Sequence, residues 1–202
     1  MKKNIEDYVF HKSGFLDSHF CKNAVVSLEE TEWDKHTFLE YASKDDGSMI
    51  TWAASPAKEL EPSYKDGVSN LTSDIVLLND FIIKELYDLI QEYVDFIGFE
   101  WFNSWAGYMP IKFIRYSLNE KMVEHWDAIR TMFDGERKGI PILSVIGTLN
   151  DDYEGGELIL FRDKKIDMKA GDLLIFPSSF MYPHKIDPVK KGSRYSYVSW
   201  IW

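Results

Sequence analysis

Apolar residues in the middle of the chain recur at steps of three and four positions. The recurrence runs through residues 79–97 and predicts one amphipathic helix, because this spacing places apolar side chains on a single helix face. A shorter helix is expected across residues 33–41. Residues 43–73 contain SKDDG, SPAKELEPS and YKDGVSN, whose turn-forming residues predict a long loop.

From Ile111 onward, short apolar or alternating runs replace the helical spacing. Such runs predict strands, and they read IKFIRYS, VEHWD, PILSVIGTL, GELILF, DLLIF and SRYSYVSWIW. The glycines and aspartates of the intervening DDYEGG, KAGD and DPVKKGS segments are typical of tight turns. Helices followed by many short strands indicate an α+β fold, either a helix-backed β-sandwich or a jelly-roll barrel.

The length of 202 residues favours one domain with one substantial core. Within it we expect a helical or irregular part, residues 1–110, to pack on a core of strands formed by residues 111–202. The single cysteine, Cys21, excludes an internal disulfide framework and fits a reducing compartment.

Acidic residues outnumber basic ones by 33 to 23, which gives a formal net charge of −10. This balance counts against nucleic acid as a partner, because binding to phosphate backbones requires clustered Lys and Arg. The N-terminal MKKNIEDYVF lacks the apolar run of a secretory signal, and no stretch approaches the roughly 18 apolar residues that span a bilayer. We therefore expect a cytoplasmic protein that does not engage a membrane. The oligomeric state stays open.

His125 and Asp127 lie two positions apart in VEHWD. On a strand their side chains leave the same face, so the pair could share one metal ion. A partly exposed histidine beside a solvated aspartate is the alternative interpretation of this pair taken alone.

His184 lies on a later expected strand, and Arg194 and Ser196 share one face of the next. An arginine that faces inward is costly to bury unless it meets an anion. That anion is either a carboxylate of the chain or the carboxylate of a small molecule, whose hydrogen bonds a guanidinium and a hydroxyl together complete.

Two histidines and one carboxylate make up the facial triad that binds iron(II) and leaves other coordination positions open. With these motifs, residues 111–202 resemble the iron(II)/2-oxoglutarate oxygenase superfamily, in particular its prolyl 4-hydroxylase-like branch. The resemblance rests on IRYSLNEKMVEHWD, TLNDDYEGGELILF, KAGDLLIFPSSFMYPH and RYS. It implies a double-stranded β-helix (jelly-roll) core, with iron(II) held by His125, Asp127 and His184.

The resemblance also implies a pocket for the cosubstrate 2-oxoglutarate. Arg194 would bind its distal carboxylate, with Ser196 at the serine of the Arg-x-Ser motif. Thr148 falls where a hydroxyl residue often assists that carboxylate, and Tyr116 matches a tyrosine upstream of the first histidine. One departure is Met122, which stands where prolyl hydroxylases often have a second tyrosine.

The implied activity is hydroxylation of a C–H bond, with release of succinate and CO2 and with ascorbate as a reductant. The expected substrate is a prolyl residue in a peptide or protein. Alternatives are a free amino acid, a small metabolite, a nucleic-acid base, a cupin-type metal enzyme that is not an oxygenase, and a binding module. Zinc also suits such ligands. Aromatic residues could line a substrate groove or belong to the core: Trp101, Phe102, Trp105 and Tyr108.

Overall fold

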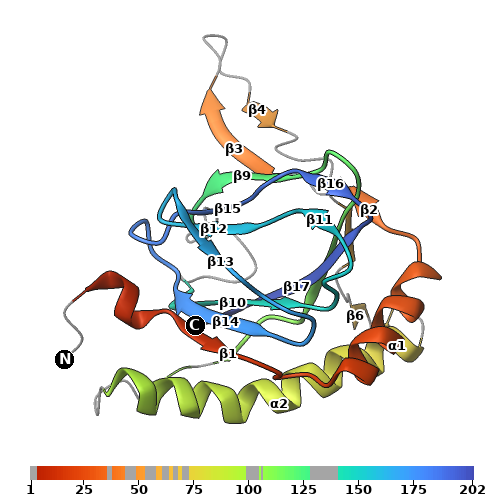
Figure 1. Ribbon diagram of the computed structural model, residues 1–202, viewed down its shortest axis with the longest axis horizontal. Helices are drawn as coiled ribbons and strands as arrows, with labels where there is room; N and C mark the ends of the chain where they lie inside the picture. Colours follow the sequence, from red (N-terminus) through yellow and green to blue (C-terminus); the bar gives the residue numbers. More distant parts are fainter. Residues whose placement is uncertain are drawn as a thin grey trace.

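The computed structural model describes residues 4–35, 38–43, 49–52, 58–60, 64–65, 68–69, 73–98, 105, 107–127 and 141–202. Two facing sheets of mainly short strands lie one above the other in Figure 1, and the helices lie beneath the lower sheet. The described residues do not include Trp101, Phe102 or residues 36–37, which belong to the shorter expected helix.

The larger sheet is antiparallel throughout and places the strands of the C-terminal half at its centre. In spatial order its strands are β1 (Phe10–Lys12), β14 (Leu173–Pro177), β10 (Leu143–Thr148), β17 (Arg194–Ile201), β8 (Lys112–Tyr116), β5 (Lys58–Leu60) and β2 (Asp34–Lys35).

A smaller antiparallel sheet faces the larger one across the barrel (Figure 1). Its strands, in spatial order, are β13 (Lys164–Ile166), β12 (Leu158–Leu160), β15 (His184–Ile186) and β9 (Met122–His125). Three further strand pairs are β11 (Glu154–Gly155) with β16 (Val189–Lys191), β3 (Phe38–Ser43) with β4 (Met49–Trp52), and β6 (Tyr64–Lys65) with β7 (Val68–Ser69).

The central strands are buried on both faces, because the sheet separates two apolar clusters. Phe113 and Val145 point to the helix side, while their neighbours Ile114 and Ile146 point into the barrel. This alternation follows from the two-residue period of a strand. The expected strands are thereby confirmed, and they form an α+β architecture with two apolar layers.

Two helices cover the outer face of the larger sheet. The helix α2 (Ser73–Ile97) contains the expected segment and starts six residues earlier. Its three- and four-residue apolar spacing places a row of buried side chains in the cluster shared with the sheet. The other helix, α1 (Ser18–Glu29), begins after Asp17, whose carboxylate accepts hydrogen bonds from the backbone of His19 and Phe20. A one-turn 3-10 helix, η1 (Ile5–Tyr8), precedes β1.

The short helix expected at residues 33–41 is wrong, because the described residues there form β2 and β3. The loop expected at residues 43–73 is also wrong in part, because it contains β4 to β7. Residues 33–41 are few and mix apolar with charged residues, so their periodicity does not separate helix from strand. The strands within residues 43–73 have only two to four residues each, which is too short for a clear alternating pattern. Pairing decides instead: β5 hydrogen-bonds to β8 and so extends the larger sheet.

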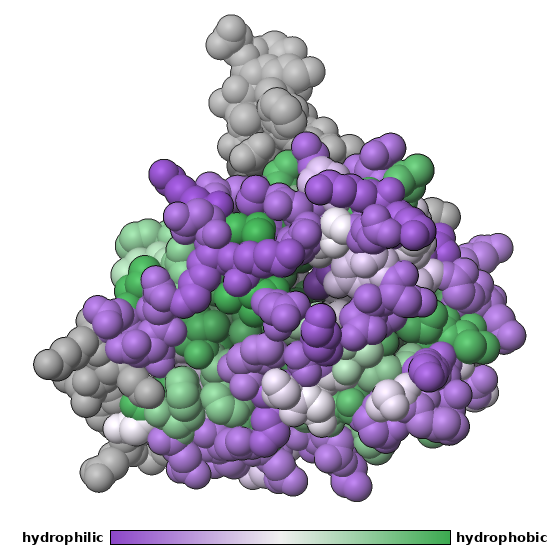
Figure 2. All heavy atoms as spheres, viewed as in Figure 1, coloured by the Kyte–Doolittle hydropathy of each residue, from purple (hydrophilic) through white to green (hydrophobic). Residues whose placement is uncertain are grey.

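Hydrophilic residues cover most of the face seen in Figure 2, with apolar residues in smaller groups between them. In the described part of the chain, neither helix combines the length and apolar character needed to cross a membrane.

Asp172 fastens the N-terminal segment to the turn before β14. One carboxylate oxygen accepts the backbone N–H of Gly14 at 2.9 Å, and the other accepts that of Lys169 at 2.9 Å and lies 3.0 Å from His11 Nε2. Burial would raise the pKa of this carboxyl, but the hydrogen bonds from Lys169, Gly14 and His11 bring the pKa below its ordinary value. The side chain therefore stabilises the fold in its charged form.

We predict that Asp172→Asn lowers the free energy of unfolding by about 1–3 kcal/mol at pH 7, because its amide group can accept only one of the two backbone N–H groups, of Gly14 and Lys169, that the carboxylate accepts. The folded-state pKa is depressed, so the difference from wild type should be full above the ordinary carboxyl pKa of about 4 and should shrink as pH falls through the folded-state value. Denaturant unfolding at several pH values measures it. Asp167→Asn is the control, since that side chain is exposed. An unchanged free energy at pH 7 would contradict the fastening role.

Candidate metal centre

His125, Asp127 and His184 converge at one end of the barrel. Each offers one ligand atom, and these atoms all lie within 4.8 Å of one another. Asp127 Oδ1 is 3.7 Å from His125 Nε2, and Asp127 Oδ2 is 3.8 Å from His184 Nε2. The sequence predicted that His125 and Asp127 lie on one strand, but β9 ends at His125 and Asp127 follows it. The structure nevertheless brings the three predicted residues together.

Pairing of β9 with β15 explains how residues far apart in sequence meet. His184 lies directly opposite His125 in the register of the two strands. Their ring centroids are 4.3 Å apart. Neighbouring antiparallel strands place opposite side chains within this distance on a shared face.

Each imidazole is oriented by a backbone carbonyl two residues before it. His125 Nδ1 lies 2.8 Å from Val123 O, and His184 Nδ1 lies 3.1 Å from Tyr182 O. A proton on each Nδ1 completes these hydrogen bonds and leaves the Nε2 lone pair for a metal ion, as in many metal sites. Burial and the nearby His184 lower the pKa of His125 to about 4. Both features favour the neutral ring that a metal requires.

Asp127 is held by groups that the sequence interpretation did not identify. Ser144 Oγ donates to Asp127 Oδ2 at 2.6 Å and lies 2.6 Å from Ser178 Oγ. Burial would raise the pKa of Asp127, but His184 and His125, with hydrogen bonds from Ser144 and Trp200, bring the pKa below its ordinary value. Trp200 shares the inward face of Arg194 at even spacing on β17, so its position was predictable although its hydrogen bond was not.

Arg194 is almost completely buried, with 2% of its surface exposed. Nη1 donates to Ser196 Oγ at 2.9 Å, the guanidinium lies 5.5 Å from the Tyr116 ring centroid, and Nε has no hydrogen-bond partner. Among the residues that the structure describes, no carboxylate forms an ion pair with Arg194. The described chain therefore does not supply the anion that this cation requires.

Strand register gathers the other residues of the expected cosubstrate pocket around Arg194. Tyr116 lies opposite Arg194, and Thr148 lies opposite Ser196. Thr148 Oγ1 is 3.8 Å from Met168 Sδ. Burial, partly offset by Arg194, raises the pKa of Tyr116 to about 12. The hydroxyl thus stays protonated at neutral pH and remains a hydrogen-bond donor.

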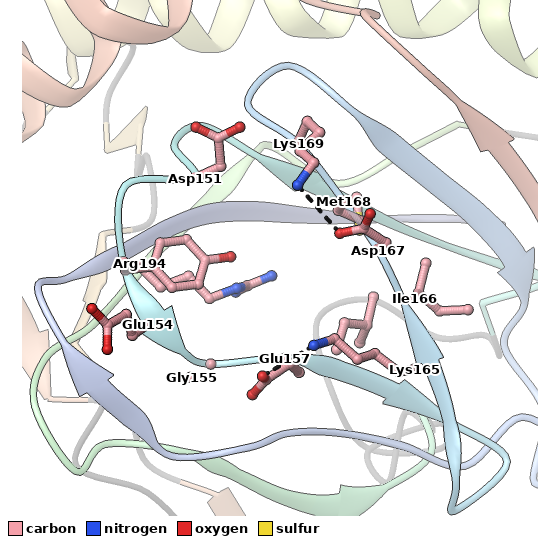
Figure 3. A pocket seen from close by; sticks show the side chains of 13 residues that line it. Asp151, Glu154, Gly155, Glu157, Lys165, Ile166, Asp167, Met168, Lys169 and Arg194 are labelled. Carbon is pink, nitrogen blue, oxygen red and sulfur yellow. Dashed lines mark hydrogen bonds and ion pairs between the residues drawn. The ribbon is translucent and has the colours of Figure 1, made fainter.

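A cavity of about 360 Å³ reaches Arg194 and is lined mainly by the β11–β12 and β13–β14 segments. Figure 3 shows the Arg194 side chain extending into this cavity, with a Lys165–Glu157 ion pair and a Lys169–Asp167 ion pair along its wall. Gly156 leaves room for the Arg194 side chain, because a Cβ there would lie only 3.2 Å from Arg194 Cδ. The triad does not line this cavity.

Trp105 and Tyr108 lie elsewhere. Their rings stack at 5.7 Å, and Trp105 contacts Tyr87 of α2. Both pack against the apolar cluster between the helices and the larger sheet, which contains Phe113 and Val145 and is called the helix-side cluster below. Of the two alternatives for these residues, a substrate groove or the core, the contacts support the core.

Comparison with known proteins agrees with this geometry. Residues 111–202 match the 2OG-Fe(II) oxygenase superfamily, where 2OG denotes 2-oxoglutarate. A PKHD-type hydroxylase of Alteromonas mediterranea is 36% identical over 99 residues, which cover 46% of this chain and 42% of that protein. The chain thus spans about two fifths of the length of the curated relatives it matches.

Solved structures share the fold at low sequence identity. A Pseudomonas putida prolyl-4-hydroxylase has a TM-score of 0.64 at 16% identity, covering 96% of this chain and 91% of that chain. A Trichoplax adhaerens prolyl hydroxylase, in complex with a hypoxia inducible factor oxygen degradation domain peptide fragment, has a TM-score of 0.64 at 18% identity, covering 97% and 84%. The jelly-roll core is thereby confirmed. Residues 111–202 are therefore similar to 2OG-Fe(II) oxygenases, and the fold of the chain is that of the solved prolyl hydroxylases.

We predict that His125→Ala, Asp127→Ala and His184→Ala each weaken binding of Fe(II) by more than about 100-fold, because even loss of a group that only orients a ligand costs 10- to 100-fold. Anaerobic Fe(II) titration measures the affinity, and circular dichroism checks that the fold persists. Glu124→Ala is the control, an acid beside His125 whose side chain is 42% exposed. If a variant binds Fe(II) as tightly as wild type does, the residue replaced in it is not a metal ligand.

Proposed function

We propose that this protein is an iron(II)- and 2-oxoglutarate-dependent dioxygenase that hydroxylates a C–H bond. The observation that carries the proposal is the buried Arg194, which has no acidic partner among the described residues and lies in the same barrel as the triad. A metal-binding module or a cupin-type enzyme would account for the triad alone. It would leave a buried cation without an anion, which is unfavourable by several kcal/mol in order of magnitude.

The residues present fit both groups that such an enzyme needs. Two neutral imidazoles and one ionised carboxylate suit iron(II), and His125, Asp127 and His184 would hold it. The unpartnered Nε of Arg194 suits a carboxylate, and Arg194 would bind the distal end of 2-oxoglutarate. With O2, iron and 2-oxoglutarate would supply the oxidising power, and succinate and CO2 would be released.

The chain itself contributes orientation and exclusion of water. Carbonyls of Val123 and Tyr182 hold the two imidazoles, and Ser144 fixes the carboxylate of Asp127. The buried guanidinium of Arg194 fixes the far end of the cosubstrate, with assistance from hydroxyl groups: Ser196, Thr148 and Tyr116. In a buried site these charge-assisted contacts are stronger than in water.

We propose a prolyl residue in a peptide or protein as the substrate. The names of the similar proteins support this choice, and one of them was solved with a peptide fragment. The net charge of −10 disfavours a nucleic-acid base. A proline-rich segment is already extended, so binding it costs less conformational entropy than binding a flexible peptide.

We also propose that residues 1–202 act as a single domain, in which residues 1–110 pack on the catalytic core of residues 111–202. The helix-side cluster supports this, because it joins side chains of α1 and α2 to those of β10, β14 and β17.

Arg194→Ala should weaken 2-oxoglutarate binding by about 10- to 150-fold, the equivalent of a charge-assisted contact of roughly 1.5–3 kcal/mol. Ser196→Ala should weaken it less, because a neutral hydrogen bond contributes about 0.5–1.5 kcal/mol. Calorimetric titration of the metal-loaded protein measures both. Arg162→Ala is the matched control, since that side chain is 83% exposed. If Arg194→Ala binds 2-oxoglutarate as wild type does, the arginine is not part of the cosubstrate pocket.

Peptides that contain proline should stimulate succinate release in the presence of Fe(II), 2-oxoglutarate and ascorbate, and should gain about 16 Da, the mass of one inserted oxygen atom. Matched peptides with alanine in place of proline should do neither. Mass spectrometry of both sets, with free amino acids and single-stranded DNA as further candidates, decides the substrate. Equal oxidation of the alanine peptides would refute the prolyl proposal while leaving the oxygenase proposal intact.

A further inference from the structure

Tyr182 connects His184 to the N-terminal segment through two hydrogen bonds, one at its backbone carbonyl and one from its side-chain hydroxyl. His184 Nδ1 lies 3.1 Å from the carbonyl oxygen of Tyr182, and the Tyr182 hydroxyl donates to the carbonyl oxygen of Ile5 at 2.9 Å. The second bond joins residues 177 positions apart in the chain. Tyr182 therefore links a triad residue to a part of the chain that lies outside the matched family region, residues 111–202.

Packing leaves the Tyr182 ring little freedom. The residue is 3% exposed, and its ring contacts Phe161 at 5.6 Å and Phe176 at 6.2 Å between centroids. Phe176 in turn meets the His184 ring edge-on at 5.2 Å.

The N-terminal segment is itself anchored, which allows it to act as a fixed support. Lys164 forms an ion pair with Glu6, and β1 pairs with β14. On the helix side, the Tyr93 hydroxyl of α2 donates to Tyr8 O at 3.0 Å. Ile5 therefore lies in a short stretch that is held from both the barrel and the helix layer.

We propose that Tyr182 is a positioning residue for His184, and that residues 5–8 thereby contribute to the metal centre. The proposal rests on the metal-binding role proposed for the triad. The Tyr182 hydroxyl fixes its ring and backbone through Ile5, and the fixed carbonyl sets the orientation of the His184 imidazole. Partners that orient a metal-binding histidine influence metal affinity even though they do not touch the metal.

Two tyrosines that each donate to a carbonyl of the same segment provide a matched test. Tyr182→Phe removes the hydroxyl that binds Ile5 O, in the residue whose carbonyl contacts His184. Tyr93→Phe removes a hydroxyl that binds Tyr8 O in the same segment, from a residue of α2. Co(II), a spectroscopic substitute for iron(II), is titrated into wild type, both variants and His184→Ala, and its visible absorption is recorded. Thermal unfolding without metal measures how much each substitution destabilises the fold.

We expect Tyr182→Phe to weaken Co(II) binding about three- to tenfold and to change the absorption spectrum, as loss of one neutral hydrogen bond permits. Tyr93→Phe should bind Co(II) within about twofold of wild type, even if it lowers the melting temperature as much. Equal Co(II) affinities for Tyr182→Phe and Tyr93→Phe, whether both unchanged or both weakened, would overturn the inference. If His184→Ala binds Co(II) like wild type, the proposed metal centre itself fails, which is a separate result.

Discussion

A buried guanidinium without an acidic partner among the described residues is the constraint on which the rest of the site depends. Arg194 begins β17. The neighbouring strands place Tyr116 of β8 and Thr148 of β10 around it, and Ser196 follows on β17 itself. Leaving a charge in such surroundings is unfavourable unless an anion compensates. An anion bound at Arg194 would therefore stabilise the folded protein, and without it the strand has to be held in place by other contacts.

Packing against the helices holds β17 in place. Tyr195 and Tyr197 belong to the helix-side cluster, while Arg194 and Ser196 point into the barrel. A slip of one residue in the register of β17 would exchange the two sets, because side chains alternate along a strand. It would place the arginine against apolar helices and tyrosines in the barrel. Packing of α1 and α2 on one face of the sheet thus determines which chemistry the other face presents.

Local patterns in the sequence predicted the strands of the C-terminal half and the long helix, because strand alternation and helical spacing are local properties. The triad was predicted from the spacing of His125 and Asp127 together with the family resemblance, which added His184. The signal for α1 was present and overlooked: Asp17 is a good N-cap, and buried residues follow at helical spacing, Cys21, Ala24 and Leu28. Contacts between distant segments had no such signal. The Ser144 hydroxyl reaches Asp127 only through the folded register, and nothing in the sequence near Tyr182 indicates Ile5.

The two histidines of the triad lie on short strands and Asp127 follows the end of one of them, which makes the geometry of the triad sensitive to support from outside the sheet. β15 has three residues and β9 has four, whereas β17 has eight. Short strands contribute few backbone hydrogen bonds of their own, and β9 lies at the edge of the smaller sheet, so local opening is easier there than in the central strands of the larger sheet. The support comes instead from side chains of other elements, Ser144 from β10 and the Phe176–Tyr182 packing beside His184. The geometry of the candidate metal centre thus depends on contacts with the surrounding layers as well as on β9 and β15.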